Sequence, residues 1–161
     1  MNLDSPELTP FVRDLIAHHG LQSFVETGTG YAKSLRWALS EDLDCWSCDV
    51  DQEQVENARE ECPDAHVHLN ESVAFLREVC PRVRGRALFW LDAHDPNKGE
   101  PVSAWPLADE LAVIAELRDG RDIILIDDFM DPRFSFDVSL FPKHTAEIRY
   151  GVMVIEPDEV L

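Results

Sequence analysis

The sequence predicts a doubly wound α/β fold with a mostly parallel sheet. Four short apolar runs alternate with helical patterns along the chain, and each run stops at one or two carboxylates. Short apolar runs bounded by turn residues are typical of buried parallel strands. Ligands of open α/β sheets bind at the carboxyl ends of the strands, so these acids are expected to share one edge of the sheet. They are Glu26, Asp49, Asp92, Asp127 and Asp128.

The first half of the chain contains an N-terminal helix and three strand–helix pairs. Residues 6–19 carry apolar side chains at helical spacing, with Ser5 as the expected N-cap and Gly20 as the stop. Apolar runs and helical periods then alternate regularly as far as residue 79. The expected elements are a strand over 22–26, a helix over 33–39, a strand over 45–49, a helix over 52–61, a strand over 65–69 and a helix over 72–79.

The second half continues the alternation with a strand over 86–91, a helix over 103–117 and a strand over 122–126. Right-handed crossovers then favour a Rossmann-like sheet of order 3-2-1-4-5, with the topological switch between strands one and four. Residues 145–155 predict a short C-terminal strand element, either one bent strand or two strands divided at Gly151.

Residues 131–144 show no helical period and are expected to form a loop. Phenylalanines in and beside this segment would either line a substrate pocket or cap the core beneath the loop. They are Phe129, Phe134, Phe136 and Phe141.

The length of 161 residues fits one domain over 1–161. Within it we expect the N-terminal helix in 1–20, a ligand-binding core in 21–128, and a loop and final strand in 129–161. The net charge of −18 argues against a nucleic-acid partner, because such a field repels phosphate backbones. No membrane-length apolar stretch and no signal-peptide pattern are present, so a cytoplasmic protein without a membrane partner is expected.

Cys45 and Cys48 form a C-x-x-C motif, which suggests a redox pair, a zinc site or free core cysteines. Side chains three residues apart on a strand point to opposite faces. The chain has no second C-x-x-C to complete a zinc site. Free core cysteines in a reducing compartment therefore fit best.

The segment from Glu26 to Gly30 contains G-x-G between the first strand of the core and its helix. Glycines at this point let the chain turn sharply and approach a ligand closely. Lys33 stands where a dinucleotide fingerprint has its third glycine, and an acid before the glycines would repel a phosphate. Asp49 ends the second strand, where an acid accepts hydrogen bonds from ribose hydroxyls. These features indicate a nucleoside ligand that has a positive end and no phosphates.

Three segments resemble class I S-adenosylmethionine-dependent methyltransferases: residues 24–30, 48–51 and 70–72. The resemblance implies that S-adenosyl-L-methionine is the cofactor. Its methionine part would lie against the glycine turn, its ribose against the acid of strand two, and its adenine beside the start of the helix after strand three. The cofactor-binding residues implied in this way are Glu26, Thr27, Gly28, Gly30, Tyr31, Ser34, Asp49, Glu71, Ser72 and Asp92.

Residues 89–94, 106–111 and 122–129 narrow the resemblance to macrocin-type O-methyltransferases, which use a divalent metal. The implied metal ligands are Asp92, Asp127 and Asp128, and three carboxylates suit a hard cation such as Mg²⁺ or Mn²⁺. Both aspartates after strand five can bind only if the chain curls there. The alternative is that Asp128 caps the next turn.

His94, together with Asp92, is the candidate for the catalytic step. A metal lowers the pKa of an acceptor hydroxyl, and a nearby imidazole can then take its proton. The alternative is that His94 is a surface residue or only supports a metal ligand.

The sequence thus predicts an S-adenosylmethionine-dependent O-methyltransferase that acts on a small hydroxylated acceptor with the help of a divalent metal. A homodimer partner is one way in which so short a chain would close its acceptor pocket. One alternative is a catalytically silent cofactor-binding domain that serves as a subunit or sensor. A second is a metal-dependent hydrolase that uses the same carboxylates.

Overall fold

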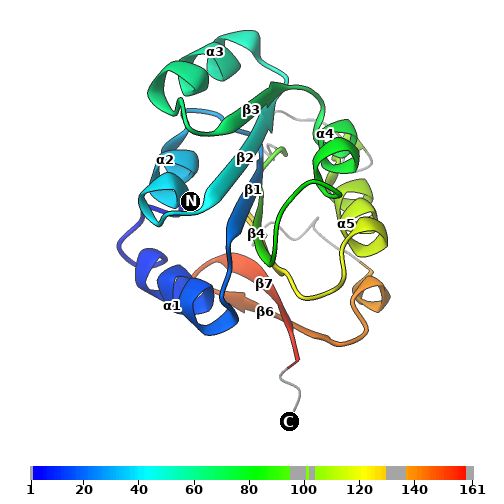
Figure 1. Cartoon of the computed structure of the whole chain (residues 1–161). Helices are drawn as coiled ribbons and strands as arrows, with labels where there is room; N and C mark the ends of the chain where they lie inside the picture. Colours follow the sequence, from blue (N-terminus) through cyan, green and yellow to red (C-terminus); the bar gives the residue numbers. More distant parts are fainter. Residues whose placement is uncertain (1, 95–100, 102–103, 130–136, 159–161) are drawn as a thin grey trace.

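A computed structural model describes residues 2–94, 101, 104–129 and 137–158. A central sheet is covered by helices on both of its faces (Figure 1). Among the described residues, no helix combines the length and apolar character needed to cross a membrane. The elements in chain order are α1 (Thr9–His19), β1 (Ser23–Thr27), α2 (Lys33–Ser40), β2 (Asp44–Asp49), α3 (Gln52–Glu61), β3 (His66–Leu69), α4 (Ser72–Val79), β4 (Ala87–Leu91), α5 (Leu107–Leu117), β5 (Ile123–Ile126), the 3₁₀ helix η3 (Val138–Leu140), β6 (His144–Arg149) and β7 (Val152–Pro157).

The sheet has the order β3-β2-β1-β4-β5-β7-β6. Its first five strands are parallel and confirm the predicted order 3-2-1-4-5. β1 pairs with β2 on one side and with β4 on the other, so that Val25 lies level with both Trp46 and Phe89. The chain therefore changes direction across the sheet between β1 and β4, at the predicted topological switch.

The C-terminal segment forms two strands rather than one bent strand. β7 pairs antiparallel with β5, and β6 pairs antiparallel with β7 at the edge of the sheet. Tyr150 and Gly151 connect the two strands with φ values of 52° and 81°. Two successive residues with positive φ are typical of a type I′ turn, which matches the twist of an antiparallel hairpin.

Most predicted boundaries lie within two residues of the observed ones, and larger differences occur in three places. α1 begins at Thr9 rather than at residue 6, because Ser5 caps a preceding turn: its hydroxyl accepts the Leu8 N–H at 3.3 Å. α5 begins at Leu107, and residue 103, where this helix was predicted to begin, lies outside the described residues. Within the predicted loop, residues 138–140 form the 3₁₀ helix η3.

The structure describes two of the four phenylalanines in and beside that loop. Phe141 is buried in the core and Phe129 packs against the same core. These two side chains therefore follow the core-capping alternative. Phe134 and Phe136 lie outside the described residues.

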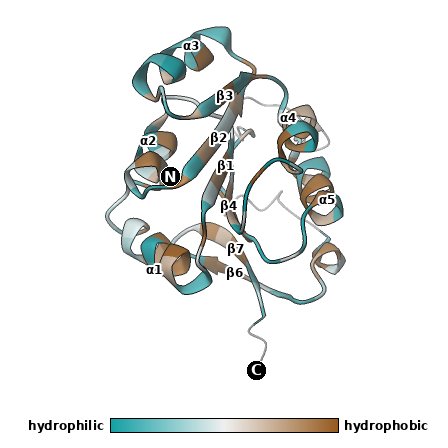
Figure 2. Ribbon diagram, viewed as in Figure 1, coloured by the Kyte–Doolittle hydropathy of each residue, from teal (hydrophilic) through white to brown (hydrophobic). Residues whose placement is uncertain are grey.

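Two apolar cores lie on opposite faces of the sheet. One joins the sheet to α1, α2 and α3, and the other joins it to α4 and α5 (Figures 1 and 2). Alternation along β1 sends Phe24 into the first core and Val25 into the second. Cys45 and Cys48 divide between the cores in the same way, and both are buried free thiols as predicted.

Arg118 follows α5 and ties together segments from three parts of the chain. Its guanidinium forms a bidentate pair with the buried Asp122 carboxylate, at 2.8 and 3.0 Å. It also donates to the backbone carbonyls of Cys80, Val83 and Gly85 at 2.7 to 3.1 Å. The pair thus fixes the loop that leads into β4 against the start of β5.

Arg118→Ala is expected to lower the free energy of unfolding by about 3–5 kcal/mol, because it leaves the Asp122 carboxylate buried without its charge partner. Urea unfolding followed by circular dichroism measures this loss. Arg121→Ala is the matched control, since its pair with Asp119 is exposed. Equal unfolding midpoints for the two variants would contradict the structural role of Arg118.

Candidate functional site

The predicted acids meet at the carboxyl ends of β1, β2, β4 and β5. Glu26 and Asp92 line one cavity, and Asp49 and Asp92 line a second. Asp92 also belongs to a cluster of three aspartates. One residue after β4 therefore joins all three parts of the candidate site.

The glycine turn after β1 is held between β2 and β4. Gly28 and Gly30 have φ values of 83° and 48°, which favour glycine. The Gly28 N–H donates to the Cys48 carbonyl at 2.9 Å, and the Gly30 N–H donates to Asp49 Oδ2 at 2.9 Å. On the other side, a Cβ at Gly28 would lie 2.4 Å from the Asp92 carbonyl oxygen. Only glycine permits this approach of two backbones.

Glu26 is a buried carboxyl in the wall of the first cavity, which has a volume of about 210 Å³. Ser47 Oγ donates to Glu26 Oε2 at 2.6 Å and lies 2.6 Å from Thr29 Oγ1. Burial raises the pKa of Glu26 to about 8, against the lowering effect of the Ser47 hydrogen bond, and the charges of Asp92 and Asp49 add to the rise. A cation in this cavity would favour the ionised carboxylate.

Three further predicted cofactor residues line this cavity together with Gly28: Gly30, Tyr31 and Ser34. Tyr31 is 79% exposed and stands at the rim. The Ser34 hydroxyl is buried and accepts the Leu3 N–H at 3.2 Å, so it also holds the N-terminal segment in place.

The second cavity has a volume of about 530 Å³ and lies along the ends of β2 and β4 and the start of α4. Asp49, Glu71 and Ser72, the residues predicted to bind a ribose and a nucleobase, line it together. Asp49 Oδ1 accepts the Asp51 N–H at 3.0 Å, while its other oxygen holds the glycine turn. Each carboxylate oxygen retains a second lone pair for a ligand hydroxyl.

Thr27 is placed differently from the other predicted cofactor residues. Its side chain is fully buried, and it faces Glu110 of α5 on the side of the sheet opposite to Glu26. Side chains alternate along β1, so Glu26 and Thr27 point to opposite faces. Thr27 therefore lines neither cavity, and its assignment as a cofactor-binding residue stays a prediction.

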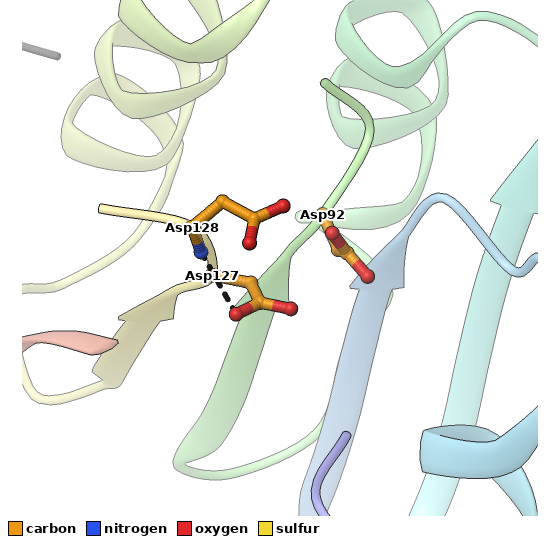
Figure 3. A group of neighbouring side chains, drawn as sticks. All are labelled: Asp92, Asp127 and Asp128. Carbon is orange, nitrogen blue, oxygen red and sulfur yellow. Dashed lines mark hydrogen bonds between the residues drawn. The ribbon is translucent and has the colours of Figure 1, made fainter. Parts of the chain in front are cut away.

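The side chains of Asp92, Asp127 and Asp128 converge after β4 and β5 (Figure 3). One carboxylate oxygen from each lies within 4.8 Å of the others. Asp128 has a φ of 53° and donates its N–H to Asp127 Oδ1 at 2.8 Å. The chain thus curls directly after β5, which is the condition for both aspartates to face one ion. Burial raises the pKa of Asp127.

His94 is buried behind this cluster and lines the second cavity. Its Nε2 lies 3.1 Å from the backbone carbonyl oxygen of Asp127. A carbonyl only accepts, so Nε2 carries the proton in this contact. The imidazole therefore braces the aspartate loop through Nε2, and any proton acceptance falls to Nδ1.

Besides Thr29, two polar residues that line the Glu26 cavity were not among the predicted binding residues. Asn2 and Lys33 line the Glu26 cavity, and Lys33 is one of three lysines in the chain. The sequence offered a signal for Lys33 alone, because it replaces a glycine of the dinucleotide pattern. Glu110 lies in the segment 106–111 that carries the family resemblance, but no role was predicted for it, although it interrupts an apolar stripe of α5 that is formed by Leu107, Leu111 and Ile114.

No family model matches the chain, and no curated protein matches it in sequence. Solved structures match it along most of its length. A sugar N-methyltransferase from Streptoalloteichus is 15% identical, with a TM-score of 0.58 over 93% of this chain. This chain spans 58% of the length of that protein.

Two other matched structures cover more of the partner chain. A putative caffeoyl-CoA O-methyltransferase from Staphylococcus aureus is 12% identical, with a TM-score of 0.64 over 94% of this chain and 84% of that one. Magnesium protoporphyrin IX methyltransferase from Synechocystis, solved with S-adenosylmethionine bound, is 10% identical, with a TM-score of 0.54 over 91% and 75%. The chain has the class I methyltransferase fold. At these identities the likeness establishes the fold, and the macrocin-type resemblance remains a prediction.

Gly28→Ala and Gly30→Ala test the backbone contact at the glycine turn. A Cβ at Gly30 would meet nothing within 4 Å. Gly30→Ala is therefore expected to lower the free energy of unfolding only by the cost of a left-handed φ for alanine, about 1–2 kcal/mol. Gly28→Ala adds a collision with the backbone of Asp92 and is expected to destabilise the fold clearly more. Thermal unfolding of the two variants makes the comparison, and an equal loss would show that the contact is not tight.

Proposed function

We propose that the chain is an S-adenosylmethionine-dependent O-methyltransferase that acts on a hydroxyl of a small molecule with the help of a divalent metal. The observation that carries this proposal is the position of Asp92, which lines both cavities and also belongs to the aspartate cluster. A ligand that fills both cavities would therefore lie beside the metal-binding carboxylates.

The chemistry of the two cavities matches the two ends of the proposed cofactor. The smaller cavity holds a buried acid, Glu26, and a lysine, Lys33, which suit the ammonium and carboxylate of an amino acid. The larger cavity holds Asp49 for the ribose hydroxyls, with Glu71 and Ser72 for the nucleobase. S-adenosylmethionine combines these two ends and, when bound, supplies a methyl group for transfer.

Asp92, Asp127 and Asp128 would hold the metal, because three carboxylates form a hard, anionic donor set. A bound Mg²⁺ or Mn²⁺ would lower the pKa of an acceptor hydroxyl. His94 braces this cluster through the Asp127 carbonyl and would receive a proton only at Nδ1. Its role as the general base remains a prediction from the sequence.

The proposed activity is tested by incubating the protein with S-adenosylmethionine, Mg²⁺ and a panel of hydroxylated acceptors, such as catechols and sugars. Formation of S-adenosylhomocysteine that depends on the acceptor supports the proposal. Binding of S-adenosylhomocysteine without turnover on any acceptor would favour the silent cofactor-binding domain. Metal binding without affinity for either nucleoside would favour the hydrolase.

Affinity for S-adenosylhomocysteine is expected to fall as the pH drops below about 8. Glu26 is protonated there in the free protein, and binding of the ligand ammonium must release that proton, which costs up to about tenfold in affinity per pH unit. Isothermal titration between pH 6 and pH 8.5 measures this slope. Glu26→Gln should remove the slope and weaken binding at pH 8.5 by about 1–3 kcal/mol.

The exposed Glu60 of α3 provides the control for this titration. Glu60→Gln should keep both the affinity and the slope of the parent. A slope that persists unchanged in Glu26→Gln would show that the ammonium binds elsewhere.

Asp127→Asn is expected to weaken Mn²⁺ binding by at least about tenfold while leaving affinity for S-adenosylhomocysteine without metal unchanged. Asp127 belongs to the cluster but lines neither cofactor cavity. Electron paramagnetic resonance of Mn²⁺ gives the metal affinity, and Asp64→Asn, an exposed site, is the control. A parent protein that leaves millimolar Mn²⁺ free would exclude the metal site.

A further inference from the structure

Glu110 is a fully buried carboxyl that the proposed reaction does not use. It occupies the position in α5 where the stripe of Leu107, Leu111 and Ile114 calls for another apolar residue. Neither of its oxygens has a hydrogen-bond partner among the described residues. A buried polar group without a partner destabilises a fold, so the scaffold alone gives no reason for an acid here.

The groups that face Glu110 come from the elements around the second cavity. The hydroxyls of Thr27 at the end of β1 and of Ser72 at the start of α4 lie close enough to lower its pKa, although burial is the larger influence and raises it to about 7. The Cys48 thiol of β2 is also close: burial raises its pKa, and the charge of Glu110 adds to that rise. Thr27 Oγ1 is itself buried without a hydrogen-bond partner.

These neighbours connect Glu110 to the cavity. Cys48 and Ser72 line it, and Thr27 is followed directly by Gly28, which forms its wall towards Asp92. The carboxyl thus lies next to Ser72 of the cavity wall and next to Thr27, which precedes the wall residue Gly28, without lining the 530 Å³ cavity itself. Small rotations of these hydroxyls and of the carboxyl would turn the present arrangement into two hydrogen bonds.

We propose that Glu110 is a positioning residue for the adenosine end of the site: it accepts the hydroxyls of Ser72 and Thr27 and so holds the cavity wall in the shape that receives the nucleobase. This inference rests on the proposed function, since it assumes a nucleoside in the second cavity. The role is indirect, because Glu110 itself does not line the cavity.

Glu110→Met and Glu110→Gln test this role, with calorimetric titration of adenosine and of S-adenosylhomocysteine as the readout. Glu110→Met removes a desolvated acid and is expected to raise the melting temperature while weakening both ligands at least fivefold. Glu110→Gln keeps an acceptor oxygen and should remain within twofold of the parent. Glu116→Met, an exposed change on the same helix, is the control and should bind both ligands like the parent.

A double-mutant cycle separates positioning from a general effect on the core. If Glu110 acts through Ser72, then Ser72→Ala should cost clearly less affinity in the Glu110→Met background than in the parent. Unchanged adenosine affinity in Glu110→Met, additive losses in the cycle, or a Glu110→Met protein that fails to fold would each overturn the inference. A parent that binds neither ligand would overturn the proposed function itself.

Discussion

The contact between the Gly28 backbone and the backbone of Asp92 is the constraint on which the rest of the site depends. A Cβ on residue 28 would lie 2.4 Å from the Asp92 carbonyl oxygen, so the turns after β1 and β4 meet with no room for a side chain between them. This contact lies at the topological switch of the sheet. Gly28 and Asp92 line both cavities, and Asp92 also belongs to the aspartate cluster.

Two buried acids lie on opposite faces of the sheet around this contact. Glu26 lines the smaller cavity, whereas Glu110 lies next to Ser72, which lines the larger one. Burial raises their pKa values to about 8 and about 7. The folded chain thus retains protons that the unfolded chain releases above about pH 4.3. Each acid therefore contributes a loss of stability as the pH rises towards its folded pKa. Both destabilising acids thus lie around the contact between Gly28 and Asp92, where the two cavities meet the sheet.

Local patterns were sufficient for most of the architecture. The apolar runs ending at Glu26, Asp49 and Asp92 became β1, β2 and β4, because a buried parallel strand needs a continuous apolar segment. The crossover rule then determined their order. Errors fell at element ends, where tertiary contacts decide. Thr9 rather than residue 6 begins α1, because Ser5 satisfies a turn that precedes the helix.

The sequence by itself determined the doubly wound fold, the edge of the sheet that carries the acids, and the glycine turn, since these follow from strand periodicity and chain direction. The tertiary structure decided which acids share a cavity and which meet in the cluster. It alone shows that Asp128 curls back at a φ of 53° and that Thr27 turns inwards to Glu110. Such facts depend on distances between segments far apart in the chain, and local propensity does not encode those distances.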